Sequence, residues 1–133
     1  MGQAAAKAND QVSGTDIHIV MVPAGPSLVP TPLPHSFTGL LDGGLCATVK
    51  VSGQPAAVVG STATNTPPHI PSPPGISFQK PPGNKATVQM GSATVKIGGQ
   101  QAARNADIAL TCNDPADLPM GQLIAIGTVN VGG

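Results

Sequence analysis

The sequence predicts an all-β fold, a small cone of three β-hairpin repeats around a pseudo-threefold axis with long Pro-rich crossovers. Three observations lead to this prediction. The 133-residue chain contains 17 Gly and 15 Pro, spread along its length, which disfavours long helices. Its formal net charge is zero and it is too rich in branched apolar residues for a disordered chain. A twelve-residue segment also recurs, with turn residues in the same places.

The recurring segment is an alternating strand followed by a tight turn. Residues 46–57 read CATVKVSGQPAA and residues 92–103 read SATVKIGGQQAA, so eight of the twelve positions are identical. Val or Ile alternates with Thr or Lys, as in a half-buried strand, and Gly suits the positive φ of a hairpin turn. A shorter third copy, GTVNVGG, occupies residues 127–133. We therefore expect one domain over residues 1–133. Its hairpins should lie near residues 46–60, 92–106 and 123–133.

The segments between the expected hairpins are rich in proline. Residues 23–34 contain five Pro and residues 67–82 contain seven. Such stretches favour an extended, polyproline-like backbone with few amide donors. A linker between two domains would also be Pro-rich, but too little chain lies on either side of residues 61–86 for two cores. We therefore expect rigid crossovers that wrap the surface of one body.

Absent residue types exclude several functions. The chain has no Trp, no Tyr and no excess of basic residues, so we expect no nucleic-acid partner. It also has no Glu, which excludes acid–base catalysis by a pair of Glu. No apolar run reaches the length of about 18 residues that a membrane span needs, and the N-terminal segment lacks the apolar core of a signal peptide. We expect cytoplasmic synthesis and assembly.

Three histidines and a cysteine are the candidate metal ligands: His18, His35, His69 and Cys112. Their spacing matches none of the usual zinc motifs, and a surface or hydrogen-bonded role is the alternative for each histidine. However, His35, His69 and Cys112 each precede one of the three repeats, so near-threefold packing would bring them towards one axis. His18 would supply the fourth ligand. Three imidazoles and a thiolate fill a tetrahedral Zn²⁺ site, which makes it structural. Cys46 is the competing thiol.

The hairpins resemble a known family, the proline-alanine-alanine-arginine (PAAR) repeat. TVKVSGQPAA at residues 48–57 and TVKIGGQQAAR at residues 94–104 look like its apolar strand, Gly-containing turn and Pro-Ala-Ala-Arg segment. The sequence departs from that pattern at two positions. Val58 stands where Arg is usual, and Gln101 stands where Pro is usual.

The resemblance implies a structural spike tip rather than an enzyme. Such a tip is a cone with a zinc ion near its apex, and its base caps a trimeric β-helical spike, one tip per trimer. The spike would belong to a type VI secretion system or to an extracellular contractile injection particle. The tip would sharpen the spike for puncture of a target membrane, which it contacts transiently. It would carry effector cargo in some members, and it would leave the cell on firing or release. Two alternatives remain open: a zinc-dependent hydrolase, and a β-rich fibre or adhesion module.

Overall fold

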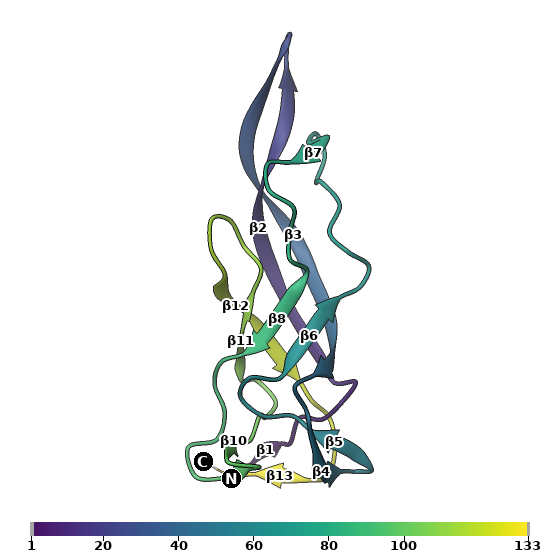
Figure 1. The fold of residues 1–133 in the computed structure, drawn as a ribbon, viewed down its shortest axis with the longest axis vertical. Helices are drawn as coiled ribbons and strands as arrows, with labels where there is room; N and C mark the ends of the chain where they lie inside the picture. Colours follow the sequence, from purple (N-terminus) through teal and green to yellow (C-terminus); the bar gives the residue numbers. More distant parts are fainter. Residues whose placement is uncertain (1, 133) are drawn as a thin grey trace.

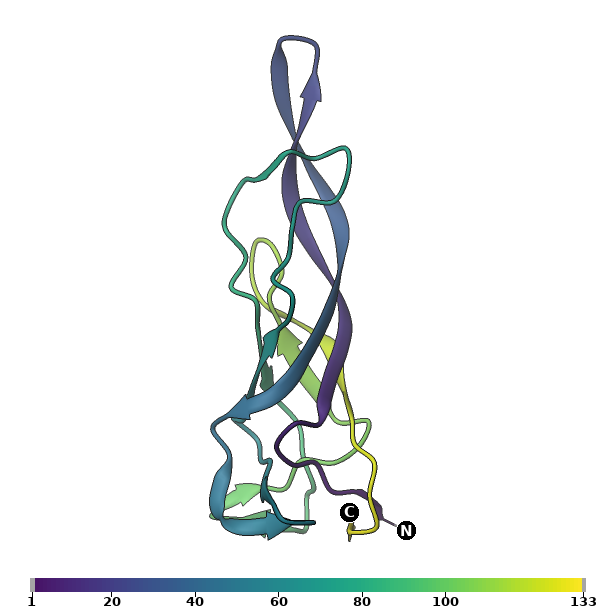
Figure 2. The same cartoon turned by 90° about the vertical axis from the view of Figure 1, so that its right-hand side faces the viewer.

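The fold is described from a computed structural model over residues 2–132; Met1 and Gly133, the two ends of the expected domain, lie outside the described residues. Residues 2–132 form strands and turns without a helix, which confirms the all-β prediction. Figures 1 and 2 show an elongated body with a narrow hairpin at one end and a broader base at the other. Over the same residues, no helix has the length and apolar character needed to cross a membrane.

Seven antiparallel strands build the body above the base. They are β2 (Gln11–Ala24), β3 (Ser27–Gly43), β6 (Thr62–Asn65), β7 (Ser77–Phe78), β8 (Lys85–Val88), β11 (Ile108–Thr111) and β12 (Leu118–Ile124). Their order is β12-β11-β8-β6-β3-β2-β7, and β12 pairs with β2 as well. That extra pairing closes six of the strands into a barrel, with β7 added on the outer edge of β2.

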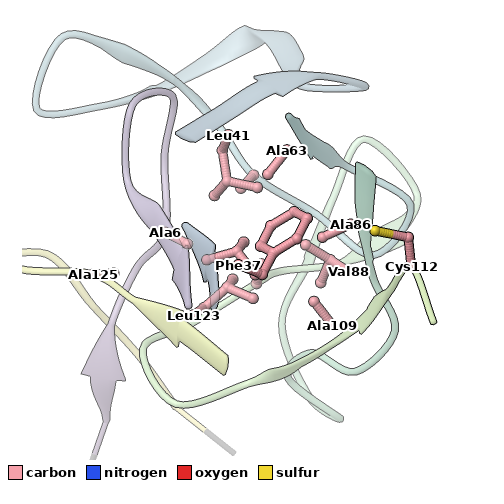
Figure 3. Packing of buried hydrophobic residues seen from close by; sticks show 13 residues of the cluster. Ala6, Phe37, Leu41, Ala63, Ala86, Val88, Ala109, Cys112, Leu123 and Ala125 are labelled. Atoms are coloured by element: carbon pink, nitrogen blue, oxygen red, sulfur yellow. The ribbon is translucent and has the colours of Figure 1, made fainter. Parts of the chain in front are cut away.

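The barrel is narrow, and its interior is filled by a few large side chains among many small ones. Phe37 and Leu41 from β3 and Leu123 from β12 are fully buried at its centre (Figure 3). Alanines from the neighbouring strands complete the cluster. Gly39 is required by the close strand approach, because a Cβ there would lie 2.6 Å from the main-chain oxygen of Thr64.

Three small hairpins form the base of the molecule (Figure 1). The first joins β4 (Cys46–Val51) to β5 (Gln54–Ala56), and the second joins β9 (Lys96–Ile97) to β10 (Gln100–Gln101). Their turns have positive φ throughout, 50° and 82° at Ser52 and Gly53, and 59° and 85° at Gly98 and Gly99. This is the backbone that two-residue hairpin turns require.

The third hairpin is assembled from both ends of the chain. Strand β13 (Asn130–Val131), in the third copy of the repeat, pairs antiparallel with β1 (Gln3–Ala4). Residues 3–7, QAAAK, therefore take the place that QPAAV and QQAAR take after the other two turns. The third copy looks truncated in the sequence because its return strand precedes it in the chain by more than a hundred residues.

The three alanine segments meet in a closed ring of main-chain hydrogen bonds. Ala6 N donates to Ala103 O (2.9 Å), Ala103 N to Ala57 O (3.1 Å) and Ala57 N to Ala6 O (3.0 Å). All three alanines are buried. A ring in which each segment donates to the next is the pattern of a threefold axis, so the pseudo-threefold arrangement is present in the base.

Each alanine segment is followed by the same kind of hydrogen bond, which we call the latch. It joins the main chain at the position where the PAAR repeat has Arg to the side chain three residues later. The main-chain N–H of Lys7, Val58 and Arg104 donates to the side-chain oxygen of Asp10, Ser61 and Asp107, at 3.0, 3.0 and 2.7 Å. In the first and third segments the side chain pairs as well, Lys7 with Asp10 and Arg104 with Asp107. In the second segment, Val58 and Ser61 keep only the main-chain bond.

The two Pro-rich segments behave differently from each other. Residues 23–34 lie in the β2–β3 ladder and do not form the polyproline-like crossover that the sequence suggested. The ladder survives because its prolines occupy alternate positions whose main-chain nitrogens face outward and need no partner. Residues 66–84 do form a long crossover. It runs from β6 towards the narrow end, pairs through β7 with β2, and returns to β8 (Figure 1).

Candidate metal centre

Four buried side chains converge inside the upper part of the barrel. Asp16 and His18 lie on β2, His69 lies on the Pro-rich crossover, and Cys112 follows β11. One potential ligand atom from each lies within 4.8 Å of the other three. The alternation of strand β2 explains the first pair, since residues two apart point to the same face. The crossover runs past that face of β2 and so brings His69 to the cluster.

Asp16 is the hub of this cluster. Its Oδ2 atom accepts hydrogen bonds from His69 Nε2 at 2.8 Å and from Cys112 Sγ at 3.3 Å. Asn113 Nδ2 lies 3.5 Å from the other carboxylate oxygen. The side chain is fully buried. A carboxylate removed from water in this way needs nearby positive charge or donors, and the cluster offers it only these few.

His18 is the residue whose surroundings best suit a metal ligand. Its ring is 1% exposed, and neither ring nitrogen has a hydrogen-bond partner. Asp114 Oδ2 is the nearest charged atom, 3.6 Å from Nδ1, which is beyond hydrogen-bond distance. Burial lowers the pKa of His18, with Asp114 opposing that effect, so the fold favours the neutral ring. A neutral, buried imidazole with an unused lone pair is the form in which histidine binds metals.

The surroundings of the Cys112 thiol also suit a bound cation. Burial, reinforced by the neighbouring carboxylate of Asp16, raises the pKa of Cys112 to about 12. The group is therefore a thiol that donates to Asp16 when no cation is present. A bound cation reverses this preference, because it stabilises the thiolate and the carboxylate together. A divalent ion would balance the two negative charges of Cys112 and Asp16.

His35 lies beside the cluster rather than in the set of four. Its ring centroid is 5.5 Å from those of both His18 and His69, so the three imidazoles form a nearly equilateral triangle. Both of its nitrogens are engaged: Nδ1 lies 2.9 Å from Leu33 O, and Nε2 accepts the main-chain N–H of Ser72 at 3.1 Å. Burial lowers the pKa of His35 too.

Three of the four predicted ligands, His18, His69 and Cys112, are thus brought together, and His35 stands next to them. Asp16 was not among the predicted ligands. Its signal was present, since Asp16 is two residues from His18 on an alternating strand, and it lies directly opposite His35 in the ladder. Cys46, the competing thiol, lies on β4 in the base, where its Sγ is 3.4 Å from Thr48 Oγ1.

Phe78 and a cavity frame the cluster. The Phe78 ring, on β7, lies 5.8 Å from His18 and 5.3 Å from His35 between centroids, and so covers the imidazoles on the side of the crossover. A cavity of about 200 Å³ borders the cluster on the side of His18 and Cys112, with Lys80 in its wall. A second cavity, of about 410 Å³, borders the cluster on the side of His35 and His69.

Comparison with known proteins places this geometry in a family. The family model described as PAAR motif matches residues 35–115, more than half of the chain. The chain belongs to the PAAR motif family. The matched range includes the first two repeats together with His35, His69 and Cys112, whereas Asp16 and His18 precede it. No curated protein matches this chain.

Proposed function

We propose that this PAAR protein is a structural tip that caps and sharpens the trimeric spike of a contractile injection system, so that its narrow end punctures a target membrane, and that a buried zinc ion stabilises it. Membership of the PAAR family supports a spike tip over an enzyme. Within the structure, the closed ring of Ala6, Ala57 and Ala103 is the observation that carries the proposal. A threefold pattern inside a single chain is otherwise unnecessary, but it allows one chain to match a threefold partner.

The base offers the surface for such a partner. The hairpins β4–β5, β9–β10 and β13–β1 lie together at the broad end, farthest from the narrow hairpin (Figures 1 and 2). The three hairpins belong to the three copies of the repeat, so each would face one of three identical spike chains. Their side chains differ. One tip would then sit on one trimer. We expect assembly in the cytoplasm and release at the tip of the particle, of either the type VI or the extracellular class.

The residues of the cluster fit a zinc ion. His18, His69 and Cys112 belong both to the set expected from sequence and to the set that the structure brings together, so we assign these three to the ion. Asp16 takes the fourth position on the observed geometry, and His35 is the alternative. Zinc bound by four protein groups would cross-link β2, the crossover and the end of β11, which are far apart in sequence.

A zinc-dependent hydrolase is the competing function, and it needs an open metal position and a general base. Four buried donors leave no open position, and the chain has no Glu to act as a base. Cobalt substitution tests this directly, because the spectrum of a cobalt ion reports its coordination. A closed four-ligand spectrum supports a structural site, and a water ligand would favour the hydrolase.

Binding to the spike is the test of the capping role. The purified chain should bind a trimeric spike protein at one tip per trimer, measured by light scattering after size exclusion. Two exposed apolar residues provide matched variants, one in the base and one outside it. Val129→Asp, in the third copy of the repeat, should weaken the complex. Leu40→Asp, on the side of the barrel, should not. Self-association without a spike would instead support the fibre or adhesion module.

A further inference from the structure

We propose that the tip hairpin, residues 20–34, is a lipid-contacting element that enters the outer part of a bilayer. This inference deepens the proposed function, and it rests on that function for the expectation that the narrow end meets a membrane. The tip hairpin is formed by the ends of β2 and β3, and it projects beyond the rest of the molecule at the pole opposite the base (Figures 1 and 2).

The narrow end carries no formal charge. Residues 17–41 and residues 66–79 contain no Asp, Lys or Arg. Leu28 and Val29 in the tip hairpin are 47% and 45% exposed, and Ile76, whose N–H donates to the Met21 carbonyl, is 62% exposed. Exposed apolar side chains gain free energy by leaving water, and on an uncharged projection no ion has to be desolvated with them.

The backbone edges of the tip hairpin also favour lipid. Ile17 N and Ile19 N donate outward, to Asn113 and Asp114, so the residues opposite them on β3 turn their nitrogens outward as well. In the tip hairpin those alternating outward positions on β3 are occupied by Pro30, Pro32 and Pro34, and Pro23 takes the same kind of position on β2. Proline has no N–H.

Two consequences follow from this edge. At Pro30, Pro32 and Pro34 the β3 edge offers no N–H donor, so addition of a protein strand along that edge is disfavoured. An unpaired N–H in hydrocarbon costs several kcal/mol. Pro23, which lies beyond the part of β2 that β7 covers, and Pro26 in the turn have no N–H, so this end of the tip hairpin enters lipid at lower cost. The outward carbonyls remain, and they require water or headgroups. The edge is therefore suited to shallow insertion, not to spanning the bilayer.

The length of the tip hairpin agrees with shallow insertion. Strand β7 supports the hairpin as far as Met21, and the turn begins at Gly25. Four residues of strand extend about 13 Å. A headgroup layer is about 5–8 Å thick and the hydrocarbon about 30 Å. The turn, with Leu28 and Val29 close to it, would pass the headgroups and stop in the nearer leaflet.

A single tryptophan reports this insertion without background, because the chain has no Trp and no Tyr. Leu28→Trp places the probe in the tip hairpin, and Leu40→Trp places it on the same strand at matched exposure, 47% against 48%. The full chain is mixed with phosphatidylcholine vesicles, with and without phosphatidylglycerol, that carry brominated acyl chains. We expect a blue shift and about twofold quenching for Leu28→Trp on both vesicles, and neither for Leu40→Trp. No shift for Leu28→Trp, or equal shifts for both variants, would overturn the proposal.

Charged variants provide the second readout. In the otherwise unchanged chain, Leu28→Asp with Val29→Asp should reduce vesicle binding about tenfold, since each carboxylate must stay hydrated, whereas Leu40→Asp should have no effect. Binding that requires anionic lipid and ignores the Leu28 and Val29 changes would also overturn the proposal, since it would arise from the lysines. Spike capping is measured separately on the same variants. Failure to cap refutes the proposed function, whereas failure to insert refutes only this inference.

Discussion

Breaking the Arg104–Asp107 latch should destabilise the base by a predictable amount. Asp107 accepts three hydrogen bonds from Arg104, from the main-chain nitrogen at 2.7 Å, from Nε at 3.1 Å and from the guanidinium at 2.9 Å. Both side chains are largely buried. Asp107→Ala leaves the guanidinium with only the Gly91 carbonyl, at 3.4 Å, and leaves the main-chain nitrogen unpaired.

The cost follows from these contacts. Removing one partner of a largely buried pair costs about 3–5 kcal/mol, and an orphaned main-chain donor adds to it. We expect a loss of about 3 kcal/mol in the free energy of unfolding, which corresponds to roughly 10 °C in the melting temperature. Ser61→Ala, at the equivalent uncharged latch, should cost about 1 kcal/mol because only neutral hydrogen bonds are lost there.

Calorimetry and chemical denaturation of the zinc-loaded protein measure both values. Asp117→Ala is the control, since Asp117 is exposed, and it should change stability by no more than about 0.5 kcal/mol. A double-mutant cycle with Arg104→Ala should show coupling of at least about 1.5 kcal/mol. The reasoning fails if Asp107→Ala is no more harmful than Asp117→Ala, or if the cycle shows no coupling.

Three further predictions concern the core and the metal centre. Phe37→Ala should cost about 3–5 kcal/mol in denaturation experiments, because the fully buried ring fills the barrel; a cost below about 1 kcal/mol would contradict the packing. Burial lowers the pKa of His18 and His35 below their ordinary value of 6.5, so the fold favours their neutral forms. The melting temperature of the metal-free protein should therefore be constant between about pH 7 and 8 and fall as the pH drops below 6.5, and a rise on acidification would reverse this sign. Asp16→Asn should lower zinc affinity more than His35→Gln does in a chelator competition, and the opposite order would restore His35 as the fourth ligand.

The repeats were predictable because their information is local. Alternating Val and Thr or Lys, followed by a Gly-containing turn, specifies a hairpin within about twelve residues. The return strand of the third hairpin was not predicted, because pairing between β1 and β13 joins the two ends of the chain and no local pattern links them. The seven-stranded sheet was missed for the same reason, since its order brings together strands distant in sequence.

The Pro-rich tip shows where composition misleads. Five prolines in residues 23–34 suggested a polyproline-like segment, yet four of them take alternate outward positions in a regular ladder. Their spacing of two was visible in the sequence at positions 30, 32 and 34, and it was compatible with an edge strand from the start. His18, His35, His69 and Cys112 were the predicted metal ligands, and the structure brings His18, His69 and Cys112 together with His35 beside them. Asp16 was overlooked because a carboxylate was not sought among imidazole and thiol ligands.

Zinc analysis of the purified full chain tests the central claim most directly. The claim is that the buried cluster around His18 holds one structural ion. Mass spectrometry of the metal content should find one equivalent of zinc per chain, and His18→Gln should lose most of that zinc and melt at a lower temperature. Lys80→Gln, in the wall of the neighbouring cavity, should retain both zinc and stability. A zinc-free wild-type protein with unchanged melting after chelation, or a His18→Gln variant with full zinc content, would contradict the account.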